Sequence, residues 1–281
     1  MITMTRLDVG PLLGSGGQGD VYELPSDPGR LFKRYRSGVR VDETGLSALV
    51  EWRLELSPRD RAVVDKHTAW PLEVVDCPGG TLGILMNRAP RDFWHTVEGG
   101  VLPRDLSWAF MSEAARFVGL EPATPRAAVA IMVQLATAFD VLHRNGATYG
   151  DLSASNVLWT GDGCPSVLLI DCDAAEVNGR PRALREAQTP LWSCPWPGVE
   201  GRERDEFKLA MAFLRLFFRY EGPIMDSTSS IEVPSHPPVT GEAADLLTAG
   251  LRQVSVRPAA ADWLPVLREL HGGLRARRVA S

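Results

Sequence analysis

The sequence predicts an α+β fold with two lobes, a small strand-rich lobe at the N-terminus and a larger helical lobe after it. Two observations support this prediction. Short apolar segments bounded by glycine and proline turns fill roughly the first third of the chain, and long segments with apolar residues at helical spacing follow from residue 125. A length of 281 residues and a hydrophobic content of 44% are sufficient for one domain with a substantial core.

The N-terminal lobe is expected to hold five strands and one helix. The helix is predicted over residues 42–56, where Leu46, Leu49 and Leu54 keep helical spacing and Ser57-Pro58 marks the end. The strands are expected as two around a glycine turn within residues 5–24, and at residues 30–35, 70–75 and 81–86, the last two joined by Asp76-Cys77-Pro78-Gly79-Gly80.

The second lobe is expected to be mainly helical. Its clearest helix covers residues 125–144, because Pro125 suits a first helical turn and Ile131, Leu135 and Leu142 share one face. Further helices are expected at residues 204–220, 241–251 and 259–270, with a Pro- and Ser-rich loop at residues 222–238.

The overall composition argues against several classes of protein. A net charge of −5 and a pI of about 5.6 argue against a partner that is nucleic acid or an anionic membrane. The cysteines lack the spacing of a zinc site or a disulfide framework. The longest apolar run, residues 209–214, is too short to span a bilayer, and no leader precedes residue 14. We therefore expect a cytoplasmic protein. The cysteines are Cys77, Cys164, Cys172 and Cys194.

The segment Tyr149-Gly150-Asp151-Leu152-Ser153-Ala154-Ser155-Asn156 runs into an apolar strand and carries the clearest chemical signal. Asp151 and Asn156 have the spacing that phosphoryl transfer from ATP needs: the carboxylate orients a hydroxyl and accepts its proton, and the Asn helps to hold Mg²⁺. Fifteen residues after Asn156, Asp171 follows a second apolar strand and is a candidate second metal ligand. We expect Asp171 to contact the metal and Asp173 to matter much less.

Two upstream features complete the pattern. A glycine-rich segment fits G-x-G-x-x-G-x-V, in which glycines let backbone amides approach phosphates without obstruction. Lys33 lies fourteen residues after Gly19 in a strand-like segment and is suited to the phosphates of a nucleotide. The expected nucleotide-binding residues of the segment are Gly14, Ser15, Gly16, Gly17, Gln18, Gly19 and Val21.

Each feature has a purely structural alternative. The glycines are compatible with an ordinary hairpin turn, Lys33 with a solvated strand end, and Asp151, Asn156 and Asp171 with turns or helix caps. None of these alternatives explains why all the features follow one another in this order at compatible spacings. The order therefore favours a nucleotide-dependent phosphotransfer site.

In these motifs the chain resembles the protein-kinase superfamily over roughly residues 5 to 270. The Gly-Asp-Leu and Asp-Cys-Asp variants are similar to a bacterial branch of eukaryotic-like Ser/Thr kinases that has Asp-Cys-Asp in place of Asp-Phe-Gly. The resemblance implies a nucleotide-binding N-lobe at residues 1–90, a catalytic C-lobe at residues 91–270, and a tail at residues 271–281. It also implies ATP and Mg²⁺ as cofactors.

The resemblance assigns further roles. Met86 would lie at the back of the adenine pocket, with Arg88 and Ala89 in the hinge that offers backbone groups to adenine. Glu43 opens a helical pattern typical of the glutamate that pairs with Lys33, although Glu51 is nearer the usual separation. Three later positions also match: Asp205 would anchor the backbone of the catalytic loop, Thr189 would contact Asp151, and Arg257 would be structural. The catalytic set would be Asp151, Lys33, Asn156 and Asp171.

The sequence also departs from the family pattern. Tyr149-Gly150 replaces His-Arg, so activation through a phosphorylated loop is not expected. Ser153 replaces a Lys that would neutralise charge on the transferred phosphoryl group. Trp196 replaces a Glu, so that either Glu200 takes its place or the buried ion pair with Arg257 is missing.

Three functions are compatible with this pattern. The first is a protein kinase acting on Ser or Thr hydroxyls of protein substrates and controlled by a regulatory partner protein. The second is a pseudokinase that binds nucleotide or acts as a scaffold, which Ser153 and Trp196 favour. The third is a small-molecule kinase of the same fold, against which Thr189 weakly argues.

Overall fold

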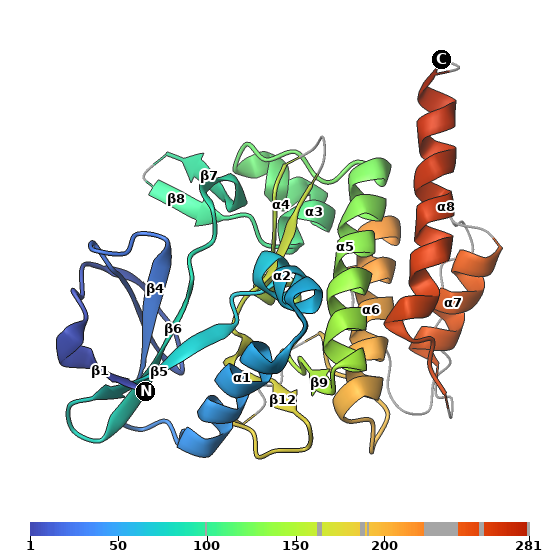
Figure 1. Ribbon diagram of the computed structural model, residues 1–281. Helices are drawn as coiled ribbons and strands as arrows, with labels where there is room; N and C mark the ends of the chain where they lie inside the picture. Colours follow the sequence, from blue (N-terminus) through green and yellow to red (C-terminus); the bar gives the residue numbers. More distant parts are fainter. Residues whose placement is uncertain are drawn as a thin grey trace.

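A six-stranded sheet forms the first lobe, and a group of long helices forms the second (Figure 1). The computed structural model describes residues 1–98, 100–161, 165–185, 189, 191–221, 241–252 and 256–279. Residues 222–240 lie outside the described residues, and with them the loop expected at residues 222–238.

The sheet has the strand order β1-β5-β6-β4-β3-β2, antiparallel throughout except for the parallel pair β1 and β5. The chain enters the sheet at β1, before the expected range, and residues 4–6 then form a short 3-10 helix in which the Leu7 N–H donates to the Met4 carbonyl. The strands are β1 (Ile2–Thr3), β2 (Leu12–Ser15), β3 (Gly19–Glu23), β4 (Arg30–Tyr35), β5 (Pro71–Cys77) and β6 (Thr81–Asn87).

Two helices, not one, lie between β4 and β5. Helix α1 (Glu43–Glu55) matches the prediction and begins at Asp42, whose side chain accepts a hydrogen bond from the Gly45 N–H at 2.9 Å. Helix α2 (Pro58–His67) was not predicted. Ser57 caps it by accepting from the Asp60 N–H, and Pro58 occupies its first turn. The Ser-Pro pair that ends one helix therefore also begins the next.

Helix α1 is fastened to the second lobe at both of its ends. At its start, the Asp42 N–H donates to the Ala183 carbonyl at 2.8 Å. Gly45 lies so close to this segment that a Cβ there would be 2.4 Å from the Ala183 nitrogen. Toward its end, the Trp52 indole donates to the Asn145 carbonyl at 2.7 Å.

Short elements connect the lobes, in a region for which the sequence predicted no structure. They are η2 (Arg91–Phe93), the hairpin β7 (Trp94–Val97) with β8 (Gly100–Pro103), α3 (Ser107–Phe110) and α4 (Ser112–Phe117). The His95 ring lies 3.2 Å from the Val118 carbonyl and links the hairpin to the end of α4. Each element is too short to show a clear period in the sequence.

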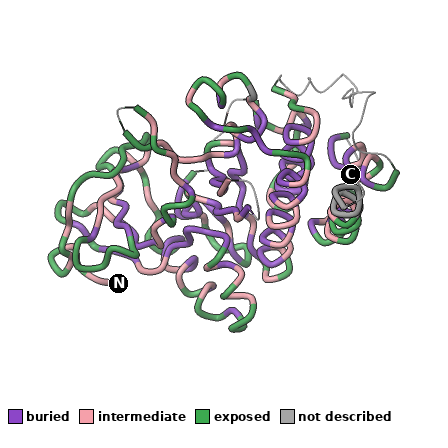
Figure 2. The backbone as a smooth tube through the Cα atoms, turned by 90° about the horizontal axis from the view of Figure 1, so that it is seen from above, coloured by how far each residue is buried: buried purple, intermediate pink, exposed green. Residues whose placement is uncertain are grey.

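The second lobe is organised around α5 (Pro125–Arg144), which has the bounds that the sequence predicted. Figure 2 shows its buried positions running along the helix. Helices α6 (Gly201–Phe218), α7 (Glu242–Leu251) and α8 (Ala260–Val279) complete the lobe. Helix α8 continues to residue 279, so most of the expected tail is an extension of this helix.

Among the described helices, α5 alone has the length and apolar composition to cross a membrane, with a mean hydropathy of 1.4. Burial inside the fold explains this composition, because 61% of the apolar window is buried and α5 packs against α6 and α8.

Two small antiparallel sheets place the chemical residues between the lobes. Strand β10 (Val157–Trp159) pairs with β11 (Val167–Leu169), and β9 (Ala147–Thr148) pairs with β12 (Glu176–Val177). The segment containing Asp151 lies between β9 and β10, and the segment containing Asp171 lies between β11 and β12. The strands that flank the Asp151 segment therefore pair with the strands that flank the Asp171 segment, which holds the two segments side by side.

Candidate active site

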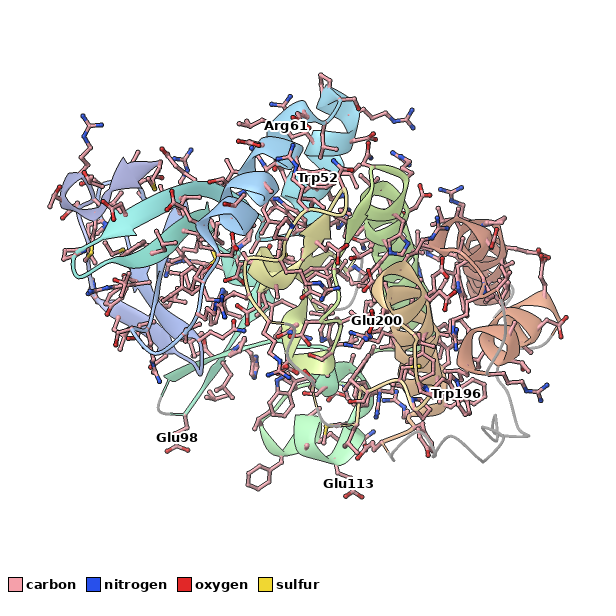
Figure 3. The ribbon with its side chains drawn as sticks, turned by 90° about the horizontal axis from the view of Figure 1, so that it is seen from below. Trp52, Arg61, Glu98, Glu113, Trp196 and Glu200 are labelled. Atoms are coloured by element: carbon pink, nitrogen blue, oxygen red, sulfur yellow. The ribbon has the colours of Figure 1, made fainter. Side chains whose placement is uncertain are left out.

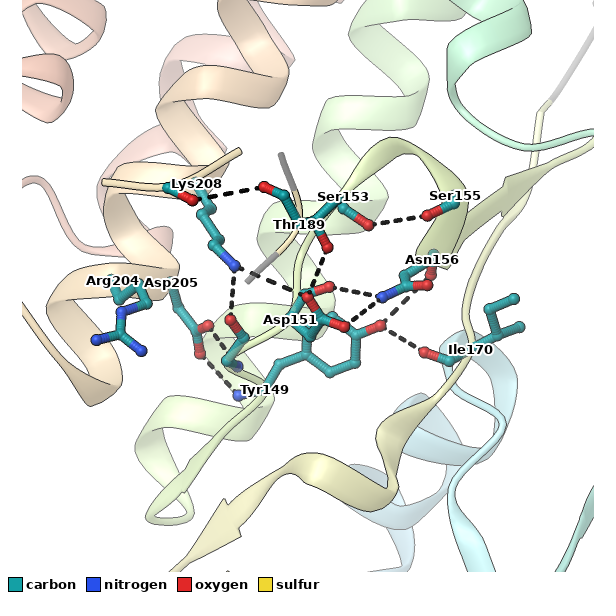
Figure 4. Close-up of polar contacts among 12 residues, drawn as sticks. Tyr149, Asp151, Ser153, Ser155, Asn156, Ile170, Thr189, Arg204, Asp205 and Lys208 are labelled. Carbon is teal, nitrogen blue, oxygen red and sulfur yellow. Dashed lines mark hydrogen bonds and ion pairs between the residues drawn. The ribbon is translucent and has the colours of Figure 1, made fainter. Parts of the chain in front are cut away.

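The backbone of the segment that contains Asp151 is anchored by Asp205 of α6. The Asp205 carboxylate is fully buried and accepts hydrogen bonds from the backbone N–H groups of Tyr149 and Gly150, each at 2.8 Å (Figure 4). The His143 ring lies 3.1 Å from the same carboxylate. This confirms the role predicted for Asp205 and fixes the backbone on which Asp151 is carried.

The Asp151 carboxylate is oriented by two neighbours. The Asn156 amide donates to Oδ2 at 2.8 Å, and the Thr189 hydroxyl donates to Oδ1 at 3.1 Å. The predicted contact between Thr189 and Asp151 is thereby confirmed. Burial raises the pKa of Asp151, while the Lys208 charge and the hydrogen bonds from Thr189 and Asn156 oppose that rise. A carboxylate with this arrangement can accept a proton from a hydroxyl that approaches it.

Asn156 and Asp171 lie at the same end of the hairpin of β10 and β11. The Ile170 N–H donates to the Asn156 carbonyl at 2.9 Å, which places the two candidate metal ligands on adjacent backbone positions. Asp171 has a left-handed backbone with φ of 53°, and 48% of its side chain is exposed. Amide and carboxylate oxygens suit Mg²⁺, which takes one or two protein ligands and completes its shell with phosphates and water. The residues present therefore fit a magnesium–nucleotide complex.

Lys33 is buried and its ammonium contacts two carboxylates. Nζ lies 3.0 Å from an oxygen of Asp171 and 2.8 Å from an oxygen of Asp173. Asp173 is almost completely buried and also accepts a hydrogen bond from the Tyr35 hydroxyl at 2.6 Å. Burial alone would lower the pKa of Lys33, but the charges of Asp173 and Asp171 outweigh it, and the pKa lies above its ordinary value.

The expected pairing of Lys33 with Glu43 is wrong in this structure. Glu43 lies in the first turn of α1 and is exposed, and Lys33 makes its ion pairs with Asp171 and Asp173 instead. The alternative, Glu51, is also exposed and pairs with Arg180 at 2.7 Å. The physical reason is the position of α1, whose face toward the lobe interior carries Leu46, Leu49 and other apolar or small side chains.

The glycine-rich segment forms the turn between β2 and β3. The Gly16 N–H donates to the Gly19 carbonyl at 2.9 Å, and the Ser15 hydroxyl donates to Asp20 at 2.6 Å. Within the described part of the chain, no atom lies within 4 Å of the place that a Cβ on Gly14 or Gly17 would occupy. The backbone at this turn is therefore open to a ligand.

Gly19 has a different role from the glycines at the tip. A Cβ on Gly19 would lie 2.4 Å from the Arg34 carbonyl oxygen, because β3 and β4 approach closely at this point. The Arg36 guanidinium also reaches back to Ser15 at 2.7 Å and to Asp20 at 3.2 Å. The base of the turn is thus held to β4, the strand that carries Lys33.

An apolar surface lies beside Lys33. Leu31, Ala69 and Met86 form a small buried cluster against which Val21 and Ile170 pack. Strands β4 and β6 bring Leu31 opposite Met86. Val21, Leu31 and Met86 come from the sheet, Ala69 precedes β5, and Ile170 precedes Asp171. The cluster therefore connects the sheet that carries Lys33 with the segment that carries Asp171.

The hinge prediction requires one correction. The Arg88 N–H donates to the Gly29 carbonyl at 2.9 Å, and its side chain pairs with Glu23 at 2.6 Å. Arg88 therefore uses its backbone donor within the protein. Ala89 is buried, and its carbonyl accepts from the Trp94 indole at 3.3 Å, which leaves its N–H as the hinge donor to consider.

Of the two outcomes that the sequence suggested for Arg257, the structure agrees with the second, in which the buried ion pair is missing. Glu200 is exposed at the start of α6, while Trp196 is buried nearby (Figure 3). Arg257 instead lies 3.8 Å from Glu203, and its guanidinium donates to the carbonyls of Gly250 and Arg252. Arg257 is thus a structural residue, as expected, with a different acidic neighbour.

Four site residues were not singled out as such by the sequence. Tyr149 donates its hydroxyl to the Ile170 carbonyl and so joins the Asp151 segment to the Asp171 segment. Asp173 and Tyr35 surround Lys33. Lys208 lies on α6 beside Asp151. The only signal for Lys208 was its place one helical turn after Asp205, which puts both side chains on the same face.

Comparison with known proteins identifies the architecture. No model of a protein family matches the chain, and no curated protein matches its sequence. Among the solved structures that match is the kinase domain of Mycobacterium tuberculosis PknI, in a double-mutant form, with 19% identity and a TM-score of 0.59. The match covers 94% of each chain. The chain therefore has the two-lobed α+β fold of a protein kinase, as the sequence predicted.

Proposed function

We propose that this chain is a Mg²⁺- and ATP-dependent kinase that transfers the γ-phosphoryl group to Ser or Thr hydroxyls of proteins. The observation that carries the proposal is the arrangement around Asp151. Its carboxylate is oriented by Asn156 and Thr189 on a backbone that Asp205 fixes. The adjacent segment contains Asp171, which pairs with Lys33 of β4. A kinase site consists of these parts.

Each group has a distinct task in this proposal. Asp151 orients the acceptor hydroxyl and takes its proton. Asn156 and Asp171 would hold a magnesium ion, which would supply positive charge beside the phosphates. Lys33 would contact the phosphates, with Asp173 as its remaining partner.

The nucleotide would lie between the lobes. The glycine-rich turn offers open backbone near the phosphates, while Leu31, Met86 and Val21 offer an apolar surface to adenine. The Ala89 N–H would be the hinge donor. In this assignment residues 1–90 form the nucleotide-binding lobe and residues 91–270 the catalytic lobe.

The contact between Thr189 and Asp151 supports a Ser or Thr acceptor on a protein. Thr189 belongs to the segment that matches the peptide-binding region in the family pattern, and its hydroxyl lies 3.1 Å from the carboxylate that would receive the acceptor. A protein substrate, with a second protein as regulator, also agrees with the net charge of −5, which disfavours nucleic acid.

A nucleotide-binding scaffold is the second candidate. The observation that favours it is Ser153, a fully buried serine at the position where a lysine would face the transferred phosphoryl group. A protein with this defect would bind ATP without transferring phosphate.

Incubation with radiolabelled ATP and Mg²⁺ separates the two functions. We expect label to appear on the protein itself or on a generic acceptor protein, with phosphoserine or phosphothreonine after acid hydrolysis. The same reaction without Mg²⁺, and a reaction with Asp151→Asn, are the controls. ATP binding without transfer above the Asp151→Asn background would support the scaffold.

A further inference from the structure

The segment of residues 149–156, called the catalytic segment below, has no cationic side chain of its own beside Asp151. Ser153 is fully buried, and its hydroxyl lies 3.2 Å from the Ser155 hydroxyl. The segment from residue 149 to residue 156 contains no Lys, Arg or His. Any positive charge near the acceptor hydroxyl must therefore come from another element or from the metal.

Lys208 of α6 brings a positive charge to this place. Its side chain is buried, with 3% exposed, and Nζ donates to the Gly150 carbonyl at 2.8 Å. The same nitrogen lies 4.0 Å from Oδ1 of Asp151, the oxygen that also accepts from Thr189 (Figure 4). Lys208 thus contacts the catalytic segment from α6, the same helix that carries the anchoring residue Asp205.

Lysine is a rare and specific choice at this position. The chain contains three lysines among its 30 Lys and Arg residues, namely Lys33, Lys66 and Lys208. Lys66 is exposed on α2, whereas Lys33 and Lys208 are buried and both approach acidic side chains of the candidate site. Burial of an ammonium group is costly unless it is paired and hydrogen-bonded, so a lysine that is buried and placed against a carbonyl and a carboxylate indicates a requirement for its charge.

We propose that Lys208 supplies from α6 the positive charge that Ser153 does not supply, and that it holds the catalytic segment and the Asp151 carboxylate in the position that proton transfer needs. The inference rests on the proposed kinase function. Lys208 acts through Asp151 and the Gly150 carbonyl, so it is a positioning residue.

The two contacts of Lys208 define this role. Nζ donates to the Gly150 carbonyl at 2.8 Å and lies 4.0 Å from Oδ1 of Asp151, so one ammonium group approaches both the backbone just before Asp151 and its carboxylate. Loss of this group should slow phosphoryl transfer without weakening ATP binding, because both contacts lie on the segment that carries Asp151, whereas Lys33 and Asp171 are the candidate ligands of phosphate and metal.

The test compares three variants with the parent, by steady-state phosphoryl transfer and by equilibrium binding of ATP. Lys208→Gln keeps a donor for the Gly150 carbonyl but removes the charge. We expect kcat to fall about tenfold or more, with ATP affinity within about twofold of the parent. Lys208→Arg keeps the charge and should retain more of the parental kcat than Lys208→Gln does. Lys66→Gln removes the exposed lysine and should leave kcat and ATP affinity unchanged.

A rescue variant separates the charge from the packing. Adding Ser153→Lys to Lys208→Gln restores a cation beside Asp151 from the catalytic segment itself, and we expect it to recover part of the lost kcat. A double variant as slow as Lys208→Gln, or a Lys208→Gln protein with the parental kcat, would overturn the inference. A parent protein without any transfer would instead overturn the kinase function, and the inference with it. Thermal melting of each variant identifies losses that come from unfolding.

Discussion

Lys33 and Asp173 form the most deeply buried ion pair of the site, with Nζ 2.8 Å from the carboxylate. Side-chain exposure is 5% for Lys33 and 1% for Asp173. Asp171, the other partner of Lys33, has 48% of its side chain exposed. The two aspartates of Asp171-Cys172-Asp173 therefore divide their work: one is open to a metal ion, and the other holds the lysine.

Asp173→Asn is expected to lower both stability and nucleotide affinity, while it still affects metal binding much less than Asp171→Asn. The change removes the negative charge that pairs with Lys33 but keeps an oxygen that accepts the hydrogen bond from the Tyr35 hydroxyl. The free energy of unfolding should fall by about 1–3 kcal/mol, the scale of a hydrogen bond to a charged group. Urea denaturation measures the loss. Tyr35→Phe is the matched control and should cost about 1 kcal/mol. An Asp173→Asn protein as stable as the parent would show that the pair contributes nothing.

Lys33→Met is expected to weaken ATP binding in the presence of Mg²⁺. Loss of one charge-assisted contact to phosphate corresponds to about 1.5–3 kcal/mol, or roughly 10- to 150-fold in Kd. Titration calorimetry with a non-hydrolysable ATP analogue measures the change. Arg34→Met removes the neighbouring cation, whose side chain points to the other face of β4, and should leave Kd within about twofold. Equal losses in both variants would contradict the assignment of Lys33.

Asp171→Asn is expected to reduce turnover to near background, because the half-exposed carboxylate is the candidate metal ligand. The apparent affinity for Mg²⁺ should fall, and higher Mg²⁺ should recover part of the activity. Titrating Mg²⁺ at saturating ATP, for Asp171→Asn and for Asp173→Asn, distinguishes the two roles. If both variants respond to added Mg²⁺ in the same way, the division between the two aspartates is wrong.

Asp151→Asn is expected to leave nucleotide affinity nearly unchanged and to lower phosphoryl transfer by about 10²-fold or more, the usual scale for a general base. The reason is that Asp151 faces the acceptor hydroxyl, whereas Lys33 and Asp171 face the nucleotide. Single-turnover transfer to an acceptor protein and equilibrium binding of ATP are measured on the same preparation. A variant that transfers phosphate at the parental rate would remove Asp151 from the mechanism.

Gly19→Ala is expected to destabilise the protein more than Gly17→Ala. The new methyl group would lie 2.4 Å from the Arg34 carbonyl oxygen, whereas at Gly17 no described atom lies within 4 Å of it. Forcing β3 and β4 apart should cost about 1–3 kcal/mol. Thermal and urea denaturation of the two variants provide the comparison. A Gly17→Ala protein that is the less stable of the two would contradict the position of the turn.

Local signals explain which parts of the fold the sequence predicted. Helix α5 has a proline in its first turn and a regular apolar face, and both properties are encoded within twenty residues. Helix α2 was missed because Ser57-Pro58 is a signal both for the end of one helix and for the start of another. The short elements between residues 91 and 117 carry too few residues for either period to appear.

The candidate site was predicted where a residue's role depends on motif order, and missed where it depends on contacts between lobes. The order of motifs predicted Asp151, Asn156 and the anchor Asp205. The partner of Lys33 could not be read in this way, because the choice between a helix glutamate and Asp173 depends on how α1 packs. Glu43 fits the helical pattern but lies in the first turn, away from the lysine.

The position of the Lys33 partner also limits how activity can be controlled. Where the partner is a helix glutamate, displacement of that helix breaks the ion pair and switches the enzyme off. Here the partner is Asp173, which lies two residues after Asp171, the candidate metal ligand. Helix α1 is held against Ala183 through Gly45. Movement of α1 would leave the lysine with its counter-ion. A regulator that breaks this ion pair must therefore move the segment from Asp171 to Asp173. The same movement would displace Lys33, the candidate phosphate ligand, and Asp171, the candidate metal ligand.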